Sequence, residues 1–323
     1  MRTYADSWLK VEEGLGGVRP VLKGSADELR AQFGGLLAAL APGYPQPSGS
    51  VKTEDGTLDA IKYRIYIPTG LGDGGGLPVG VYYHPGGFVL GQSEADEVLC
   101  RHIAENTKSI IFSVQYRLSP EHKAPAHLQD TMKAFEWANE NATKFGGDPN
   151  KMYTIGVSAG AGLALAVARK VTLGQSTASR DAVKGIVSFG PYTLHQDNIP
   201  QAYKSTYTSH EENGENVPVI DATTMRQFFE LAGLSPEDRD YFPALDQGHH
   251  KHFPPTYIVT CEFDPLRDDG LVMAQSLKAA GVPVKADHYD GLPHCFWLFP
   301  SLPETEVFMK NAVDGVKWVI NQM

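Results

Sequence analysis

A serine set between small residues, where a strand turns into a helix, constrains this chain most. Residues 156–160 read GVSAG, which fits the pattern G-x-S-x-G. Residues 151–155 favour a short strand, and the small apolar residues 161–169 favour a helix. In this context the pattern predicts a nucleophile elbow, a sharp turn that lifts the hydroxyl of Ser158 clear of the sheet. The alternative is an ordinary tight turn that holds a bystander serine.

Two further side chains lie downstream, where predicted strands end. Residues 255–261 favour a buried strand that Asp264 follows, and residues 282–289 favour another, ahead of the loop that holds His294. Catalytic groups of open parallel sheets gather at the carboxyl edge of the strands, and serine, acid, histidine is the chain order that accompanies this elbow. We therefore predict that His294 activates Ser158 and that Asp264 orients His294.

Asp268 and Asp269 compete with Asp264 for the role of the acid. Both lie in the helix expected after Pro265, where carboxylates of the first turn interact favourably with the helix dipole. Their position favours that local role. For His294 the alternative is a loop histidine on the surface.

A glycine pair follows another predicted strand. Residues 79–83 favour a strand, and HPGGF follows at residues 84–88. We predict that the backbone N–H groups of Gly86 and Gly87, with that of Ala159, bind the negative oxygen of a tetrahedral intermediate. The proline at position 85 has no N–H to donate. The alternative is a plain loop with two flexible glycines.

Together these motifs resemble the hormone-sensitive-lipase-like carboxylesterases of the α/β-hydrolase fold. YRLSPE at residues 116–121, DPLRD at 264–268 and HCF at 294–296 also match, and the resemblance covers about residues 79–299. It implies an α/β fold with a mostly parallel central sheet, helices on both faces and a helical cap. It also implies a serine carboxylesterase without metal or cofactor, with the catalytic and oxyanion residues predicted above. Pro85 and Val157 depart from the family pattern, which usually has glycine and an acidic residue there.

Two segments are expected to form the cap of a single domain that spans residues 1–323. The resemblance implies that residues 1–45 contribute to it. Residues 192–244 interrupt the strand–helix alternation and favour a helical insertion over the serine, with an ordinary surface helix as the alternative. We predict that Phe88, Tyr192 and Phe296 line the substrate pocket.

Several other polar groups favour structural roles. We predict that Tyr116, Arg117 and Glu121 form a network beneath the site, with Arg117 paired to Glu121, and that His84 orients its loop. The histidines at 249, 250 and 252 favour a polar loop over a metal site. The glycines between residues 70 and 76 favour a loop, because no helix follows them to complete a phosphate cradle.

Charge and composition limit the classes of partner that we expect this chain to bind. The net charge of −10, without a long basic run, argues against nucleic acid and against stable association with an anionic membrane. The sequence shows neither a signal peptide nor a membrane span. Cys100, Cys261 and Cys295 leave at least one thiol unpaired, which favours a reducing, cytoplasmic compartment. We expect a small-molecule ester as partner and leave a homodimer open.

Hydrolysis of short- to medium-chain carboxylic esters through an acyl-enzyme is the expected function. A tailoring hydrolase, acyltransferase or lyase of natural-product pathways is the alternative, since water and another acceptor compete for one acyl-enzyme. Relatives that lost the histidine act as small-molecule receptors, and the presence of His294 argues against that role. Peptidase activity is a weaker alternative still, because the leaving group of an amide needs more assistance than that of an ester.

Overall fold

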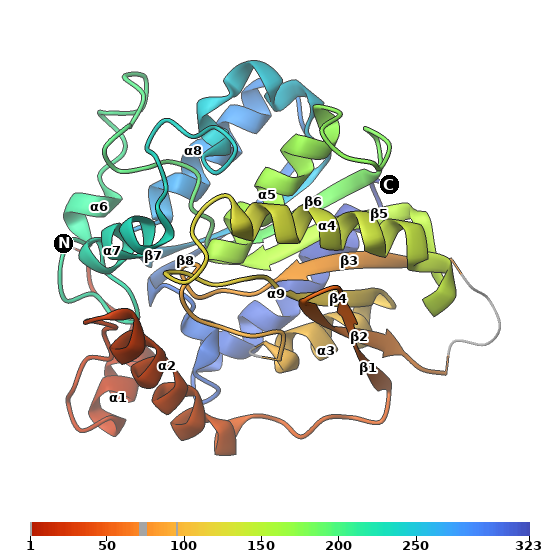
Figure 1. Cartoon of the computed structure of the whole chain (residues 1–323). Coiled ribbons are helices and arrows are strands. Elements are labelled where there is room, and N and C mark those ends of the chain that lie inside the picture. The colour runs from red at the N-terminus through yellow and green to blue at the C-terminus, as the bar shows by residue number, and fades with distance from the viewer. Residues whose placement is uncertain (1, 71–75, 95) are drawn as a thin grey trace.

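One mixed sheet of eight strands organises the computed structural model, which describes residues 2–70, 76–94 and 96–323 (Figure 1). The strand order is β1-β2-β4-β3-β5-β6-β7-β8. β2 is antiparallel to β1 and β4, and the remaining neighbours are parallel. The strands are β1 (Val51–Leu58), β2 (Ile61–Pro68), β3 (Leu77–Tyr83), β4 (Ile110–Gln115), β5 (Gly147–Val157), β6 (Val183–Phe189), β7 (Thr256–Phe263) and β8 (Val284–Pro293). Most of the predicted 70–76 loop lies outside the described residues.

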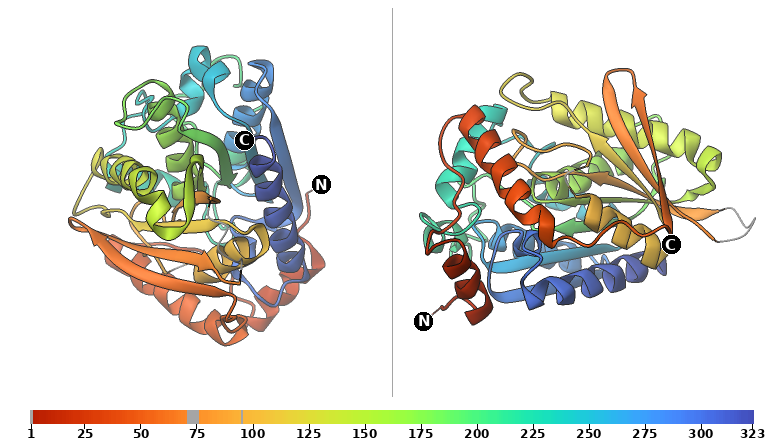
Figure 2. Two further views of the ribbon diagram at one scale, coloured as in Figure 1. Left: turned by 90° about the vertical axis from the view of Figure 1, so that its right-hand side faces the viewer. Right: turned by 90° about the horizontal axis from the view of Figure 1, so that it is seen from below.

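Helices cover both faces of this sheet, because parallel neighbours need crossover connections. α3 and α9 lie on one face, and α4, α5 and α8 lie on the other (Figures 1 and 2). These helices are α3 (Glu97–Thr107), α4 (Ala126–Asn141), α5 (Ala159–Thr172), α8 (Arg267–Ala279) and α9 (Pro303–Ile320). In the described part of the chain, no helix is long and apolar enough to cross a membrane.

The central strands are mostly apolar along the stretches where both of their faces are covered. Residues 152–157 of β5 and 256–261 of β7 are all buried, in agreement with the short strand predicted at residues 151–155 and the buried strand predicted at 255–261. The edge strand β1 has mostly exposed or half-buried residues, and we did not predict it.

The two segments expected to form a cap contact each other. The N-terminal segment holds α1 (Asp6–Gly14) and α2 (Ala26–Leu40); residues 192–244 are largely irregular, with α6 (Ser209–Glu212), α7 (Ala222–Ala232) and a short 3₁₀ turn. The N–H of Leu22 donates to the carbonyl of Val219 at 3.1 Å, and the hydroxyl of Thr224 donates to the carbonyl of Leu22 at 2.8 Å. α1, α2, α6 and α7 gather at the end toward which the parallel strands point (Figure 1).

Candidate active site

Ser158 is the single residue between β5 and α5. β5 ends at Val157 and α5 begins at Ala159, so the serine takes φ 54° and ψ −118°. A non-glycine residue with positive φ stores backbone strain, which the surrounding structure must maintain. Gly160 makes this crossing possible, because a Cβ there would lie 1.8 Å from the carbonyl oxygen of Tyr83 in β3. The sequence pattern thus corresponds to a tight strand–turn–helix.

Asp264 and His294 meet at the same edge of the sheet. Asp264 directly follows β7, and His294 directly follows β8. The Nδ1 of His294 donates to Oδ2 of Asp264 at 2.7 Å, while Oδ1 of Asp264 accepts from the N–H of Leu266 at 2.8 Å. Both side chains are buried, and Nε2 of His294 has no hydrogen-bond partner among the described residues. One imidazole nitrogen is therefore fixed by the carboxylate and the other is available.

The glycine pair after β3 forms a strained turn. Gly86, Gly87 and Phe88 have φ of 119°, 59° and 68°. The carbonyl of Gly86 accepts hydrogen bonds from the N–H groups of Val89 and Leu90, at 3.0 and 2.8 Å. A Cβ on Gly86 would lie 2.3 Å from the carbonyl oxygen of Leu90. Within the described residues, the N–H groups of Gly86, Gly87 and Ala159 donate to no backbone carbonyl outside regular helices and strands.

His84 and Tyr116 support this turn from below. The Nδ1–H of His84 donates to the carbonyl of Pro85 at 2.7 Å, and the hydroxyl of Tyr116 donates to the carbonyl of His84 at 2.8 Å. The two rings stack at 4.1 Å between centroids. Burial lowers the pKa of His84 to about 4, so the imidazole is neutral at pH 7. The contacts agree with the predicted structural role of His84.

The predicted pairing of Arg117 with Glu121 is wrong. Arg117 makes a two-pronged contact with Asp130 of α4, at 2.7 and 2.8 Å, and Glu121 pairs with Arg30 of α2. Both side chains are about half-exposed, not buried. The reason is geometric. Arg117 and Arg30 each face a carboxylate that they bind through two parallel hydrogen bonds, whereas Arg117 and Glu121 are close only in the sequence.

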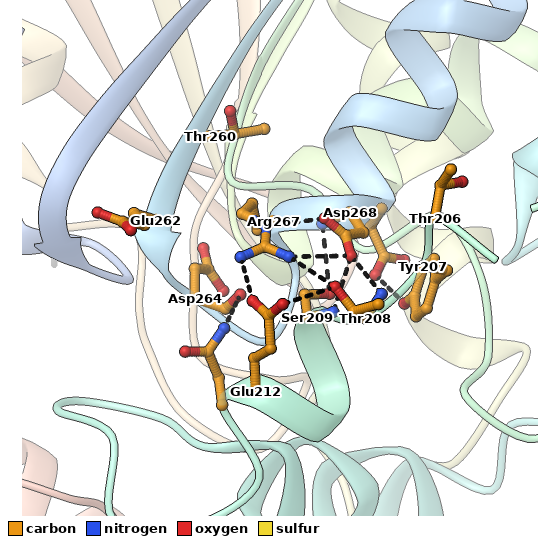
Figure 3. A network of polar contacts seen from close by, with 12 residues as sticks. Thr206, Tyr207, Thr208, Ser209, Glu212, Thr260, Glu262, Asp264, Arg267 and Asp268 are labelled. Carbon is orange, nitrogen blue, oxygen red and sulfur yellow. Dashed lines mark hydrogen bonds and ion pairs between the residues drawn. The ribbon is translucent and has the colours of Figure 1, made fainter. Parts of the chain in front are cut away.

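Asp268 and Asp269 hold the 192–244 insertion through its backbone N–H groups, and Figure 3 shows Asp268 with its partners. Oδ2 of Asp268 accepts from the N–H groups of Thr208 and Ser209 at 2.6 and 2.7 Å. Oδ1 of Asp269 accepts from the N–H groups of residues 193 and 194 at 2.7 and 2.8 Å, and Tyr207 donates to its other oxygen. Both lie in the first turn of α8, as predicted. They are buried, however, and bind backbone N–H groups of the insertion instead of only interacting with the helix dipole.

The three predicted pocket residues are fully buried in this closed arrangement. Phe88 packs against Tyr192 at 5.3 Å between centroids, and Phe296 packs against Tyr289 at 4.9 Å. Ser158 itself is only 5% exposed. Their role as pocket lining stays a prediction.

Phe228 of α7, in the 192–244 insertion, reaches the glycine turn. A Cβ built on Gly87 would lie 2.3 Å from the Phe228 ring, which is itself buried. The ring therefore lies directly against the backbone whose N–H is a predicted oxyanion donor. The sequence marks Phe228 only as one of several aromatic residues in the insertion.

The histidine cluster is remote from this site. His249 and His252 line a surface pocket of about 350 Å³ together with Thr172, Leu173, Arg180 and Asp181. α5 separates the two places by its 14 residues, about 21 Å. His250 is buried, with its Nδ1 2.7 Å from the hydroxyl of Ser276 and its Nε2 2.9 Å from the carbonyl of Pro243. The expected polar loop is a short 3₁₀ helix, Gln247–His252.

Gly190 is a site residue that sequence reasoning missed. It follows β6, has φ 61°, and a Cβ there would lie 3.2 Å from Cε1 of His294 and 3.6 Å from Oδ2 of Asp264. The available signal was a glycine directly after the KGIVSF segment at residues 184–189, which forms most of β6. An added Cβ would be an ordinary contact for the carboxylate but would press the imidazole away by a few tenths of an ångström.

Gly190→Ala should lower kcat for p-nitrophenyl acetate roughly tenfold, because the histidine must shift. Gly281→Ala is the matched control: its φ is 82° and nothing lies within 4 Å of the added Cβ. Both variants should lose stability from backbone strain of about 1–2 kcal/mol, measured by thermal melting. Equal kcat values in the two variants would contradict a specific contact with His294.

Comparison with known proteins places the chain in a family. Residues 80–298 match the family described as alpha/beta hydrolase fold. A versiconal hemiacetal acetate esterase of Dothistroma septosporum is 47% identical over 320 residues, covering 99% of this chain and 96% of that protein. The structure of vibralactone cyclase has a TM-score of 0.87 at 27% identity and covers 99% of this chain and 96% of that one. The Pyrobaculum calidifontis esterase has a TM-score of 0.84 at 29% identity, with 98% of each chain covered.

The family match includes every predicted catalytic and oxyanion residue, and the mostly parallel sheet has the helices on both faces that the resemblance implied. The Dothistroma relative and the Pyrobaculum structure are both named as esterases and are matched over at least 96% of their length, so ester hydrolysis is the reaction class. The chain belongs to the hormone-sensitive-lipase-like carboxylesterases of the α/β-hydrolase fold.

Proposed function

We propose that Ser158, Asp264 and His294 carry out ester hydrolysis through an acyl-enzyme. The observation that supports this most is the 2.7 Å hydrogen bond from His294 to Asp264, which leaves Nε2 unpartnered among the described residues at the edge where Ser158 lies. The carboxylate fixes the tautomer in which Nε2 accepts a proton. Charge on the imidazolium is then stabilised by the same contact.

In the proposed reaction, Oγ of Ser158 attacks the ester carbonyl as Nε2 of His294 takes its proton. The N–H groups of Gly86, Gly87 and Ala159 bind the oxyanion, and one such donor contributes about 3 kcal/mol to lowering the barrier. The alcohol leaves with the proton from His294. Water then attacks the acyl-enzyme with His294 as base, which releases the acid and restores Ser158.

We propose that residues 1–45 and 192–244 form one cap within a single domain. Their mutual hydrogen bonds support this, as does the contact of Phe228 with Gly87. Trp8 is fully buried against Phe299, at 4.9 Å between centroids, so the N-terminal segment is packed into the core and is more than a loose lid.

We further propose a cytoplasmic enzyme that acts on a small-molecule ester, as a monomer or a homodimer, with no stable binding to membranes or nucleic acid. The acidic net charge of −10 supports the last two points. The relative from Dothistroma is named for an acetate ester, which supports a short acyl group as the preferred substrate.

Phe228 should set the upper limit on acyl length. Each methylene buried should favour binding by about 0.8 kcal/mol until the pocket is full, so kcat/KM should peak at a short chain in the wild type. Phe228→Ala should move the peak toward longer chains, because it removes the ring that lies over Gly87. The measurement is kcat/KM for p-nitrophenyl esters with two, four, six, eight and twelve acyl carbons.

Phe229→Ala is the matched control for this prediction. Phe229 is also on α7, but its ring packs on Tyr192 and Phe242, at 5.8 and 5.5 Å between centroids. This variant should lose stability without moving the peak. A shifted peak in Phe229→Ala, with an unchanged one in Phe228→Ala, would transfer the limit to the core aromatic cluster.

Transfer of the acyl group to an acceptor other than water is the second candidate, since one neighbouring structure is a cyclase. Hydrolysis in ¹⁸O-labelled water should place one heavy oxygen in the released acid. Unlabelled cyclic or transferred ester as the main product would favour the second candidate.

A further inference from the structure

Arg30, on the cap helix α2, contacts the loop that carries the glycine turn. Its Nε donates to the carbonyl of Val89 at 3.1 Å, and its Nη2 donates to the carbonyl of Ser119 at 2.9 Å. Nη1 and Nη2 also donate to the two carboxylate oxygens of Glu121, each at 2.7 Å. One side chain thus connects α2 with the segments that follow β3 and β4.

The backbone contacts of Arg30 lie next to Phe88, the strained non-glycine residue of the glycine turn. Phe88 has φ 68°, a conformation that persists in a non-glycine residue only where the surroundings enforce it. Its carbonyl accepts from the N–H of Ser119 at 2.8 Å, and Arg30 holds the carbonyl of that same serine and that of Val89, the residue after Phe88. The guanidinium therefore holds the residue that follows the strained position and the serine whose N–H binds the carbonyl of Phe88.

We propose that Arg30 is a positioning residue for the oxyanion site. It holds the 86–89 backbone in the conformation in which the N–H groups of Gly86 and Gly87 face the reacting carbonyl, and it does so without touching the substrate. The packing of α2 against these segments is thereby coupled to the conformation of the oxyanion site. This inference rests on the proposed oxyanion role of these glycines. Displacements of about 1 Å can cost about 100-fold in rate.

The ion pair is suited to a constant mechanical role. The hydrogen bonds from Arg30 lower the pKa of Glu121 to about 2, and those from Glu121 raise the pKa of Arg30. Both groups therefore stay charged from about pH 5 to 9. Because the pair is partly exposed, its loss should change global stability little. The contribution of Arg30 to kcat should be independent of pH over that range.

Arg30→Met tests the proposal, with Arg226→Met as matched control. Arg226 is also a cap residue, on α7, and pairs with Asp197 at 2.9 Å on the surface. We would measure kcat and KM for p-nitrophenyl acetate, and inhibition by a trifluoromethyl ketone, whose serine adduct carries an oxyanion. The unfluorinated methyl ketone serves as a ligand that lacks this charge.

In Arg30→Met, kcat and the affinity for the trifluoromethyl ketone should fall together, by about 10- to 100-fold. KM, methyl ketone affinity and melting temperature should stay near wild type, and Arg226→Met should change none of these quantities. Glu121→Gln keeps the hydrogen bonds from Arg30 to the carbonyls of Val89 and Ser119. This variant should therefore lose less kcat and less affinity for the trifluoromethyl ketone, with the other quantities unchanged. That variant carries the test if Arg30→Met does not fold.

A lower melting temperature with unchanged kcat and ketone affinity would make Arg30 a purely structural residue. Equal loss of both ketones would point to pocket shape and also overturn the proposal. If the wild type itself failed to bind the trifluoromethyl ketone better than the methyl ketone, the proposed oxyanion role would fail instead. The two failures are therefore distinguishable.

Discussion

Ser158→Ala should reduce kcat/KM for p-nitrophenyl acetate by about 10⁴-fold or more, because the covalent route is lost with the hydroxyl. A fluorophosphonate probe should add one label to the wild-type protein, and peptide mapping by mass spectrometry should place it on Ser158. The strained φ of 54° between β5 and α5 is the structural basis of this expectation.

Ser188→Ala is the matched control for the nucleophile. Ser188 lies in β6, is buried, and donates to the carbonyl of Ala161 at 3.2 Å. Its loss should leave labelling and most of the activity intact. Labelling of another residue, or full esterase activity in Ser158→Ala, would refute the assignment.

Asp264→Asn should reduce kcat by about 10⁴-fold while leaving the fold intact, since an amide favours the wrong tautomer of His294. Asp268→Asn is the comparison that the structure makes informative. Its carboxylate binds the N–H groups of Thr208 and Ser209, so the change should loosen the insertion, lower the melting temperature and raise KM. Its kcat should stay within about tenfold of wild type.

Saturating p-nitrophenyl acetate separates these outcomes, with thermal melting measured in parallel. The assignment of the acid would be reversed by a near-normal kcat in Asp264→Asn combined with a loss of about 10⁴-fold in Asp268→Asn. Large losses of kcat in both variants, with unchanged melting temperatures, would mean that the anchoring of the insertion also positions the acid.

The elbow and the strands were predictable because their determinants are local. A glycine-rich turn between a buried strand and a small apolar helix is visible within about 20 residues of Ser158, and continuous apolar runs reveal β5 and β7 because both faces of these strands are covered. Asp264 and His294 were predictable as strand-end residues, and their hydrogen bond is the contact that this placement implies.

The polar contacts of α2 and of the 192–244 insertion were not predictable, because they join residues distant in sequence. Glu121 lies four residues from Arg117 but binds Arg30, which is 91 residues away. Asp268 looked like a helix-dipole charge and is an anchor for backbone N–H groups about 60 residues earlier.

The sequence by itself determined the fold class, the elbow and the order of the three expected catalytic residues, since each depends on local pattern and on strand ends meeting at one edge. Only the tertiary structure decided which carboxylate each arginine binds, that a Cβ on Gly190 would crowd His294, and that Phe228 lies over Gly87. Those features depend on the packing of side chains from separate elements, and no short-range pattern in the sequence encodes that packing.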